Sequence, residues 1–120
     1  MDKKLIGRRG EHDAAEYLRK KKYRIVGMNF STRFGEIDLI AESRSHIVFV
    51  EVKSRKNAQF AQAREFVTPS KQRRVAAAAA LWLAQNPTEK PARFDVIEVY
   101  GTDGAVHSIN HIENAFEVEL

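Results

Sequence analysis

Two apolar runs joined by a short polar segment constrain the fold of this chain more than any other feature. Residues 35–41 and 47–53 are rich in β-branched side chains and follow a period of two, so each run predicts a β-strand. The five residues between them, 42–46, are all polar or charged, and they have the length of a hairpin connection. The sequence therefore predicts an antiparallel β-hairpin around which the other elements pack.

Folding this hairpin symmetrically about Arg44 and Ser45 sets its register. One face is then apolar and is expected to lie on a core, with the pairs Ile37–Val52, Leu39–Val50 and Ala41–Val48. The other face carries the pairs Ile40–Phe49, Asp38–Glu51 and Glu36–Lys53. Two carboxylates directly opposite each other repel, so Asp38 and Glu51 require a cation, a proton or a function that compensates them. A register shifted by two residues would instead oppose Asp38 and Lys53, an ordinary surface ion pair.

The remaining segments predict two helices and three further strands. The helices are expected over 4–21 and 69–86, the second with Thr68 as its capping residue and Pro69 at its first position. The strands are expected over 23–30, 94–100 and 106–112. The element order α-β-β-β-α-β-β predicts an α/β fold with helices packed on a central sheet. A chain of 120 residues can bury one core, so residues 1–120 are expected to form a single domain.

Apolar spacing also predicts which side chains of these elements are buried. In the first strand the side chains expected to point inward are Tyr23, Ile25 and Met28. On the second helix the expected packed face consists of Val75, Ala79, Trp82 and Leu83. The segment 54–65 between hairpin and second helix is polar and basic without periodicity, and it predicts a long loop of the kind that often carries function.

Composition excludes several classes of protein. The chain contains no cysteine, which rules out disulfides and Cys-ligated zinc. No apolar run follows the basic N-terminus or reaches the length of a membrane span, so a soluble, cytoplasmic protein without a membrane partner is expected. The four histidines show no zinc-site spacing and are interpreted as surface or structural residues: His12, His46, His107 and His111.

Basic residues are distributed unevenly along the chain. The formal net charge is +4, and Lys and Arg crowd the first 24 residues and the segment after the hairpin, while the stretch from Asp103 is nearly free of them. This asymmetry suggests either a basic face that binds nucleic acid or a surface that only confers solubility. The start of the second helix suits phosphate, although a plain amphipathic helix has the same pattern. The candidate nucleic-acid contacts are Arg8, Arg9, Arg55, Lys56, Lys71, Arg73 and Arg74.

The polar face of the hairpin contains the parts of a metal-dependent phosphodiester hydrolase. Opposed Cβ atoms of an antiparallel pair lie about 5 Å apart, so Asp38 and Glu51 can share one hard cation such as Mg²⁺ or Mn²⁺. Lys53, on the same face, can orient a water or stabilise an anionic transition state. Glu11 leans toward the packed side of the first helix, where it supplies a third carboxylate or pairs with Arg8. The sequence predicts that these residues form a catalytic site.

Two motifs of this hairpin resemble those of a bacterial protein family. The run Gly35-Glu36-Ile37-Asp38, followed by Phe49-Val50-Glu51-Val52-Lys53-Ser54-Arg55, resembles the YraN family. That family is similar to the archaeal Holliday-junction resolvases of the PD-(D/E)xK, or restriction-endonuclease-like, superfamily. The resemblance covers nearly the whole chain, because further matching segments lie at 7–11 with Ala14, 69–72, 93–96 and 111–116.

The resemblance implies a restriction-endonuclease-like mixed sheet flanked by helices, a magnesium cofactor and branched DNA as substrate. It assigns the catalytic acids to Asp38 and Glu51, the catalytic lysine to Lys53 and the helix carboxylate to Glu11. Gln72 matches a supporting polar position. The expected function is therefore a metal-dependent endonuclease, with a non-catalytic nucleic-acid-binding or partner-binding module on the same fold as the alternative. A homodimer is a further expected partner, since resolvases act as dimers on two-fold junctions.

Overall fold

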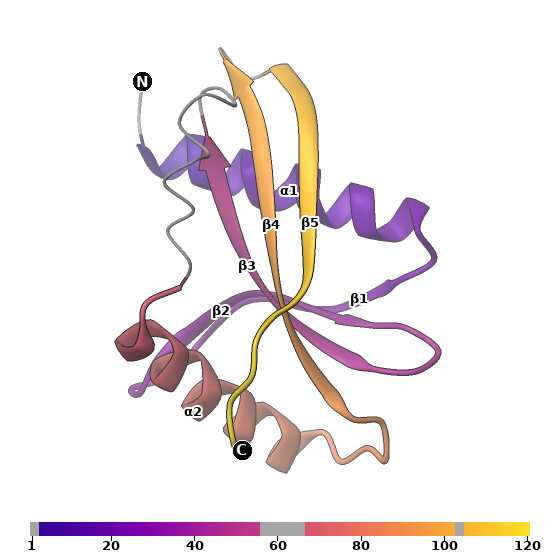
Figure 1. Ribbon diagram of the computed structural model, residues 1–120, viewed down its shortest axis with the longest axis vertical. Coiled ribbons are helices and arrows are strands. Elements are labelled where there is room, and N and C mark those ends of the chain that lie inside the picture. The colour runs from indigo at the N-terminus through magenta and orange to yellow at the C-terminus, as the bar shows by residue number, and fades with distance from the viewer. Residues whose placement is uncertain (1–2, 56–66, 103–104) are drawn as a thin grey trace.

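The computed structural model describes residues 3–55, 67–102 and 105–120 (Figure 1). Its elements, in chain order, are α1 (Lys3–Lys20), β1 (Arg24–Ser31), β2 (Glu36–Glu42), β3 (Ile47–Arg55), α2 (Pro69–Gln85), β4 (Ala92–Thr102) and β5 (Ala105–Phe116). This order confirms the predicted α-β-β-β-α-β-β arrangement and the α/β class. No helix in the described part of the chain is long and apolar enough to cross a membrane.

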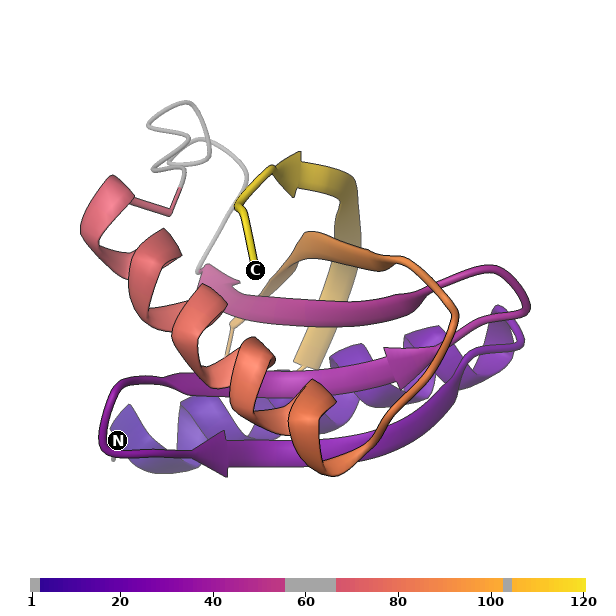
Figure 2. The ribbon, with the colours of Figure 1, turned by 90° about the horizontal axis from the view of Figure 1, so that it is seen from below.

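The five strands form one mixed sheet in the order β1-β2-β3-β4-β5. The pairs β1–β2, β2–β3 and β4–β5 are antiparallel, whereas β3 and β4 run parallel and are joined through α2. The central hairpin has the predicted register at Leu39–Val50, Ile40–Phe49 and Ala41–Val48. The ladder does not extend to the other predicted pairs, which are Ile37–Val52, Asp38–Glu51 and Glu36–Lys53. Figure 2 shows α2 in front of the hairpin strands and α1 behind them, so the sheet lies between two helices.

Two apolar cores lie on opposite faces of this sheet. The core on the α1 side is formed mainly by Ala14, Ala15, Leu18, Leu39, Ala41, Val48, Val50, Ile97 and Val99. The core on the α2 side is formed mainly by Ile37, Ile40, Ile47, Phe49, Val75, Ala78, Ala79, Trp82 and Phe94. The apolar run at the start of β3 serves both cores, because successive side chains of a strand point to opposite faces.

Two of the predicted core positions are wrong. Ile37 packs with the α2 side and not with Leu39 on the α1 side. The β2–β3 ladder begins at Leu39–Val50, so Ile37 precedes it and is not held to the alternation of the hairpin. Met28 is 44% exposed, because β1 is an edge strand with a neighbouring strand on one side only. Tyr23 and Ile25 do pack against the α1-side core as predicted.

The second helix begins and ends as its sequence predicts. The Thr68 hydroxyl accepts a hydrogen bond from the main-chain N–H of Lys71 at 3.2 Å, and Pro69 occupies the first helical position. The helix ends at Gln85, and the N–H of Asn86 caps it through the carbonyl oxygen of Trp82. Its N-terminal turn is therefore fixed, which determines where its basic side chains lie relative to the sheet.

The turn between β1 and β2 packs tightly against α2 at Gly35. A Cβ on Gly35 would overlap the main-chain carbonyl of Arg74, which cannot rotate away as a side chain can. We expect Gly35→Ala to lower the free energy of unfolding by about 1–3 kcal/mol, as overpacking typically does. Urea unfolding measures the loss, with Gly27→Ala as the matched control, because there the nearest atoms belong to the side chain of Ile40. Equal losses in the two variants would contradict the packing argument.

Candidate active site

Asp38 lies where β2 and β3 part. The β2–β3 ladder begins at Leu39–Val50, and one residue before Leu39 the Asp38 Oδ2 atom accepts a hydrogen bond from the main-chain N–H of Val52 at 2.8 Å. The carboxylate thus takes the place that a main-chain carbonyl would have in a continued ladder. This bond fixes the Asp38 side chain between the two strands.

The carboxyl groups of Asp38 and Glu51 interact directly. Burial, followed by the charge of Glu51 and a hydrogen bond with it, raises the pKa of Asp38 to about 7. The Val52 N–H and the charge of Lys71 act in the opposite direction and lower it. Near neutral pH the two carboxyl groups therefore hold a proton for part of the time.

Lys71 supplies a positive charge to this pair from the first turn of α2. Its Nζ atom lies 3.2 Å from Glu51 Oε1, and the Glu51 side chain is only 10% exposed. From the sequence, Lys71 is a predicted nucleic-acid contact, and its ion pair with Glu51 is an additional finding. It depends on where α2 crosses the sheet, which local sequence does not determine.

A second buried carboxylate lies beside Lys53. Lys53 is opposite Glu98 in the parallel β3–β4 register, and the Glu98 side chain is 3% exposed. Glu98 accepts a hydrogen bond from Asn110 Nδ2 at 2.8 Å and forms an ion pair with Arg55, whose Nε atom lies 3.4 Å from Glu98 Oε2. The predicted nucleic-acid residue Arg55 is thus largely buried and held by Glu98. The signal for it in the sequence is a glutamate between the apolar residues Ile97 and Val99 of β4.

Glu11 lies on α1, whereas Gln72 contacts the segment that leads into α2. Glu11 is a half-buried residue of α1, the helix on the other side of the sheet from α2. Over the residues that the structure describes, no three His, Cys, Asp or Glu side chains gather closely enough to hold a metal ion. Glu11 therefore does not join the pair in this structure. Gln72 Nε2 donates to the carbonyl oxygen of Val67 at 2.8 Å and fixes the entry into α2.

The remaining predicted nucleic-acid contacts are placed only in part. Arg73 and Arg74 are exposed on α2. Lys56 and the side chains of Arg8 and Arg9 lie outside the described residues.

Comparison with known proteins identifies relatives along most of the chain. The profile of the family described as "Uncharacterised protein family UPF0102" matches residues 10–99. A UPF0102 protein of Geotalea uraniireducens is 46% identical over 118 residues, which cover 98% of this chain and 93% of the relative. One from Syntrophomonas wolfei is 47% identical over 112 residues, covering 92% and 96%. A third, from Symbiobacterium thermophilum, is 47% identical over 113 residues, covering 92% and 95%.

This chain belongs to the UPF0102 family. The predicted resemblance to the YraN family is thereby confirmed, since it is the same family. The UPF0102 match includes Asp38, Glu51, Lys53 and Glu98, whereas Asn110, which donates to Glu98, lies outside it.

This UPF0102 protein also contains a buried ionic network on the α1 side of the sheet. Asp95 is fully buried and accepts hydrogen bonds from Arg93 Nε and Nη2 at 2.9 and 2.8 Å. His111 Nε2 lies 2.7 Å from Asp95 Oδ2, and the N–H of Asn114 donates to Oδ1 at 3.0 Å. Burial by itself raises the pKa of Asp95, but the bonds with His111, Arg93 and Asn114 outweigh it and lower the pKa. Of the two interpretations of His111, surface or structural, this network supports the structural one, because it connects β5 to β4.

The donor set of the Asp38–Glu51 pair fits a hard divalent cation. Both groups offer carboxylate oxygens, and Mg²⁺ binds through one or two carboxylates while keeping several waters. Their mutual repulsion, which raises the pKa of Asp38, is the interaction that a bound cation would relieve. In this UPF0102 protein, Asp38 and Glu51 are accordingly the residues that could hold a metal ion.

Proposed function

We propose that this protein is a metal-dependent endonuclease that hydrolyses phosphodiester bonds in structured, branched DNA. The observation that carries the proposal is the Asp38–Glu51 pair at the parting of β2 and β3, with Lys53 two residues after Glu51. Paired carboxylates beside a lysine suit a reaction in which negative charge develops on a phosphate. The proposed setting is the cytoplasm, and a homodimer would match the two-fold symmetry of a four-way junction.

Each residue of the site has a proposed role. Asp38 and Glu51 would hold Mg²⁺ or Mn²⁺, which would supply Lewis acidity and offset charge on the phosphate. Lys53 stabilises the charge that develops on the phosphate in the transition state. Lys71 neutralises part of the charge of Glu51 before substrate binds, because its Nζ lies 3.2 Å from that carboxylate. Glu11 is a proposed third carboxylate that would have to approach from α1, and Gln72 positions the start of α2 through Val67.

The second candidate function is a nucleic-acid-binding module without catalysis. The ion pair between Lys71 and Glu51 favours it, since this lysine already supplies a positive charge where a metal ion would bind. The two functions differ in whether the carboxylate pair takes up a divalent cation.

Calorimetric titration of Mg²⁺ and Mn²⁺ tests the metal site. We expect wild type to bind and Asp38→Asn and Glu51→Gln to lose roughly tenfold or more in affinity, because each loses a ligand. Affinity should rise between pH 6 and pH 8, since a cation must displace the proton that Asp38, with a pKa of about 7, holds at lower pH.

The matched control for this titration is Glu42→Gln. Glu42 lies on the same strand but forms ion pairs with Arg24 and Lys90 away from the site. Equal binding by wild type and Asp38→Asn, or no binding by wild type, would exclude the metal site. Cleavage of a panel of junction, flap, single-stranded and duplex DNA then tests the reaction itself.

A further inference from the structure

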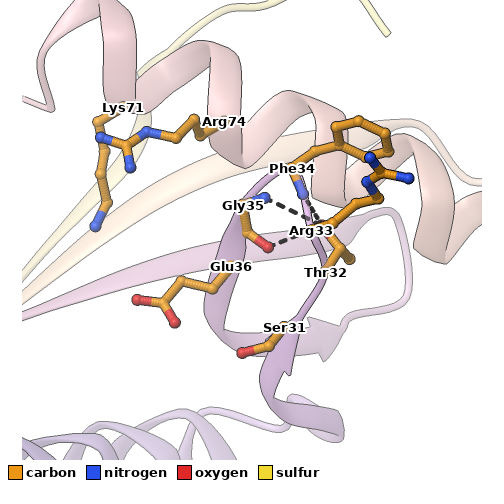
Figure 3. Close-up of a pocket in the computed structure, with 8 residues that line it drawn as sticks. All are labelled: Ser31, Thr32, Arg33, Phe34, Gly35, Glu36, Lys71 and Arg74. Carbon is orange, nitrogen blue, oxygen red and sulfur yellow. Dashed lines mark hydrogen bonds between the residues drawn. The ribbon is translucent and has the colours of Figure 1, made fainter.

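A cavity of about 260 Å³ lies between the β1–β2 turn and the first turns of α2. Figure 3 shows Lys71 and Arg74 on its α2 side, Glu36 on its strand side, and the turn residues Arg33 and Phe34 at its end. Three of these five side chains are cationic, one is acidic and one is aromatic.

The turn presents Phe34 to solvent in a fixed position. The Thr32 hydroxyl oxygen accepts hydrogen bonds from the N–H groups of Phe34 and Gly35 at 3.0 and 3.1 Å. The main-chain N–H of Thr32 also donates to the Gly35 carbonyl oxygen at 2.8 Å. Phe34 is 54% exposed, although a large aromatic side chain is normally buried. The bonds that hold the turn keep its ring outside the core.

The groups around Phe34 suit a nucleotide. The guanidinium carbon of Arg33 lies 5.3 Å from the centre of the Phe34 ring, which is a cation–π contact. Exposed aromatic rings beside Arg and Lys are the usual platform for an unstacked base and its phosphates. Arg74 and Lys71 supply positive charge from the first turns of α2. The Glu36 carboxylate would repel a phosphate, but it can accept a hydrogen bond from the amino group of a base.

Lys71 connects this cavity to the carboxylate pair. Its side chain lines the cavity, and its Nζ lies 3.2 Å from Glu51 Oε1. We infer that the cavity binds one unstacked nucleobase of structured DNA, with the phosphate next to it held by Arg33 and Arg74. This inference rests on the proposed function for its substrate class. It would let the protein select branched DNA in which a base is unpaired where duplex arms meet.

Binding without metal tests the inference separately from cleavage. Fluorescence anisotropy in the presence of a chelator compares a duplex that has one unpaired nucleotide with the fully paired duplex. We expect wild type to prefer the first and Phe34→Ala to bind it about tenfold more weakly, as for loss of one base-stacking contact. Affinity for the paired duplex should be unchanged, and Phe34→Trp should restore the preference. Because Phe34 is exposed, neither substitution removes a core side chain.

Met28→Ala is the matched control, since Met28 is an exposed apolar side chain of β1 that does not line the cavity. Equal affinity of wild type for the two duplexes, or a Phe34→Ala variant that keeps the preference, would overturn the inference. A protein that shows this preference but cuts none of the DNA panel would retain the nucleobase site and lose the proposed nuclease function.

Discussion

Replacing Lys53 by alanine is expected to slow single-turnover cleavage of structured DNA by about two to three orders of magnitude, as for loss of one group that stabilises transition-state charge. DNA affinity should barely change, because one cation among many contributes little to the whole electrostatic footprint. Lys53 follows Glu51 by two residues and so shares its face of β3. From there it can meet charge on the phosphate as that charge develops, which affects the rate and not the binding.

Paired measurements of cleavage and binding check this prediction. Lys53→Met is the companion variant, because it keeps most of the side-chain length beside Glu98 and removes only the charge. Glu51→Gln should abolish cleavage and leave binding intact. Cleavage by Lys53→Ala at the wild-type rate would show that the role given to Lys53 is wrong. A wild-type protein that binds the whole substrate panel and cuts none of it with Mg²⁺ or Mn²⁺ would be a binding module.

Replacing Asp95 by alanine is expected to lower the free energy of unfolding by about 3–5 kcal/mol, because it leaves buried charge without its partner. Arg93 donates two hydrogen bonds to this carboxylate, and His111 contacts it at 2.7 Å with a side chain that is 4% exposed. Urea unfolding at neutral pH measures the loss. Glu42→Ala is the control, since it removes a carboxylate whose ion pairs with Arg24 and Lys90 are more exposed, and a comparable loss there would contradict the argument.

The pH dependence of stability gives this prediction a second readout. The pKa of Asp95 is lower in the folded protein than its usual value, which is about 3.9 in an unfolded chain. Its stabilising contribution is therefore complete above that value and is lost as the pH falls through the lower pKa of the folded state. The difference between wild type and Asp95→Ala should accordingly shrink in acid. A difference that stays constant from pH 7 to pH 2 would contradict a role for the ionised carboxylate.

The central hairpin could be predicted because its determinants are local. Alternation of apolar and polar side chains fixes a strand's faces, and a short connection fixes the register, so Leu39–Val50 and Ala41–Val48 follow from the sequence. The helix start at Thr68 is equally local, since one hydroxyl and one proline define it. The predicted face of Ile37 is wrong because the residues around it do not indicate where pairing between β2 and β3 stops.

The rest of the site depends on contacts between distant segments. Lys71 contacts Glu51 only because α2 packs on this face of the sheet. Glu98 reaches Lys53 through parallel pairing, whose register no hairpin turn defines. The separate network on the α1 side is also long-range, because His111 and Asp95 lie 16 residues apart on paired strands. The spacing of residues along the chain does not indicate such long-range contacts.

The hydrogen bond from Val52 to Asp38 makes that carboxylate a spacer between two strands as well as a candidate ligand. Alanine at this position would leave a main-chain N–H without its acceptor at the fork. The strands could then close by one more rung and draw Glu51 toward the hairpin. Asp38→Ala would therefore remove the carboxylate and rearrange the sheet at the same time. Asp38→Asn keeps an oxygen that accepts from Val52 and removes only the charge. Asp38→Asn is therefore the variant that isolates the charge of Asp38, because it keeps β2 and β3 apart at this point.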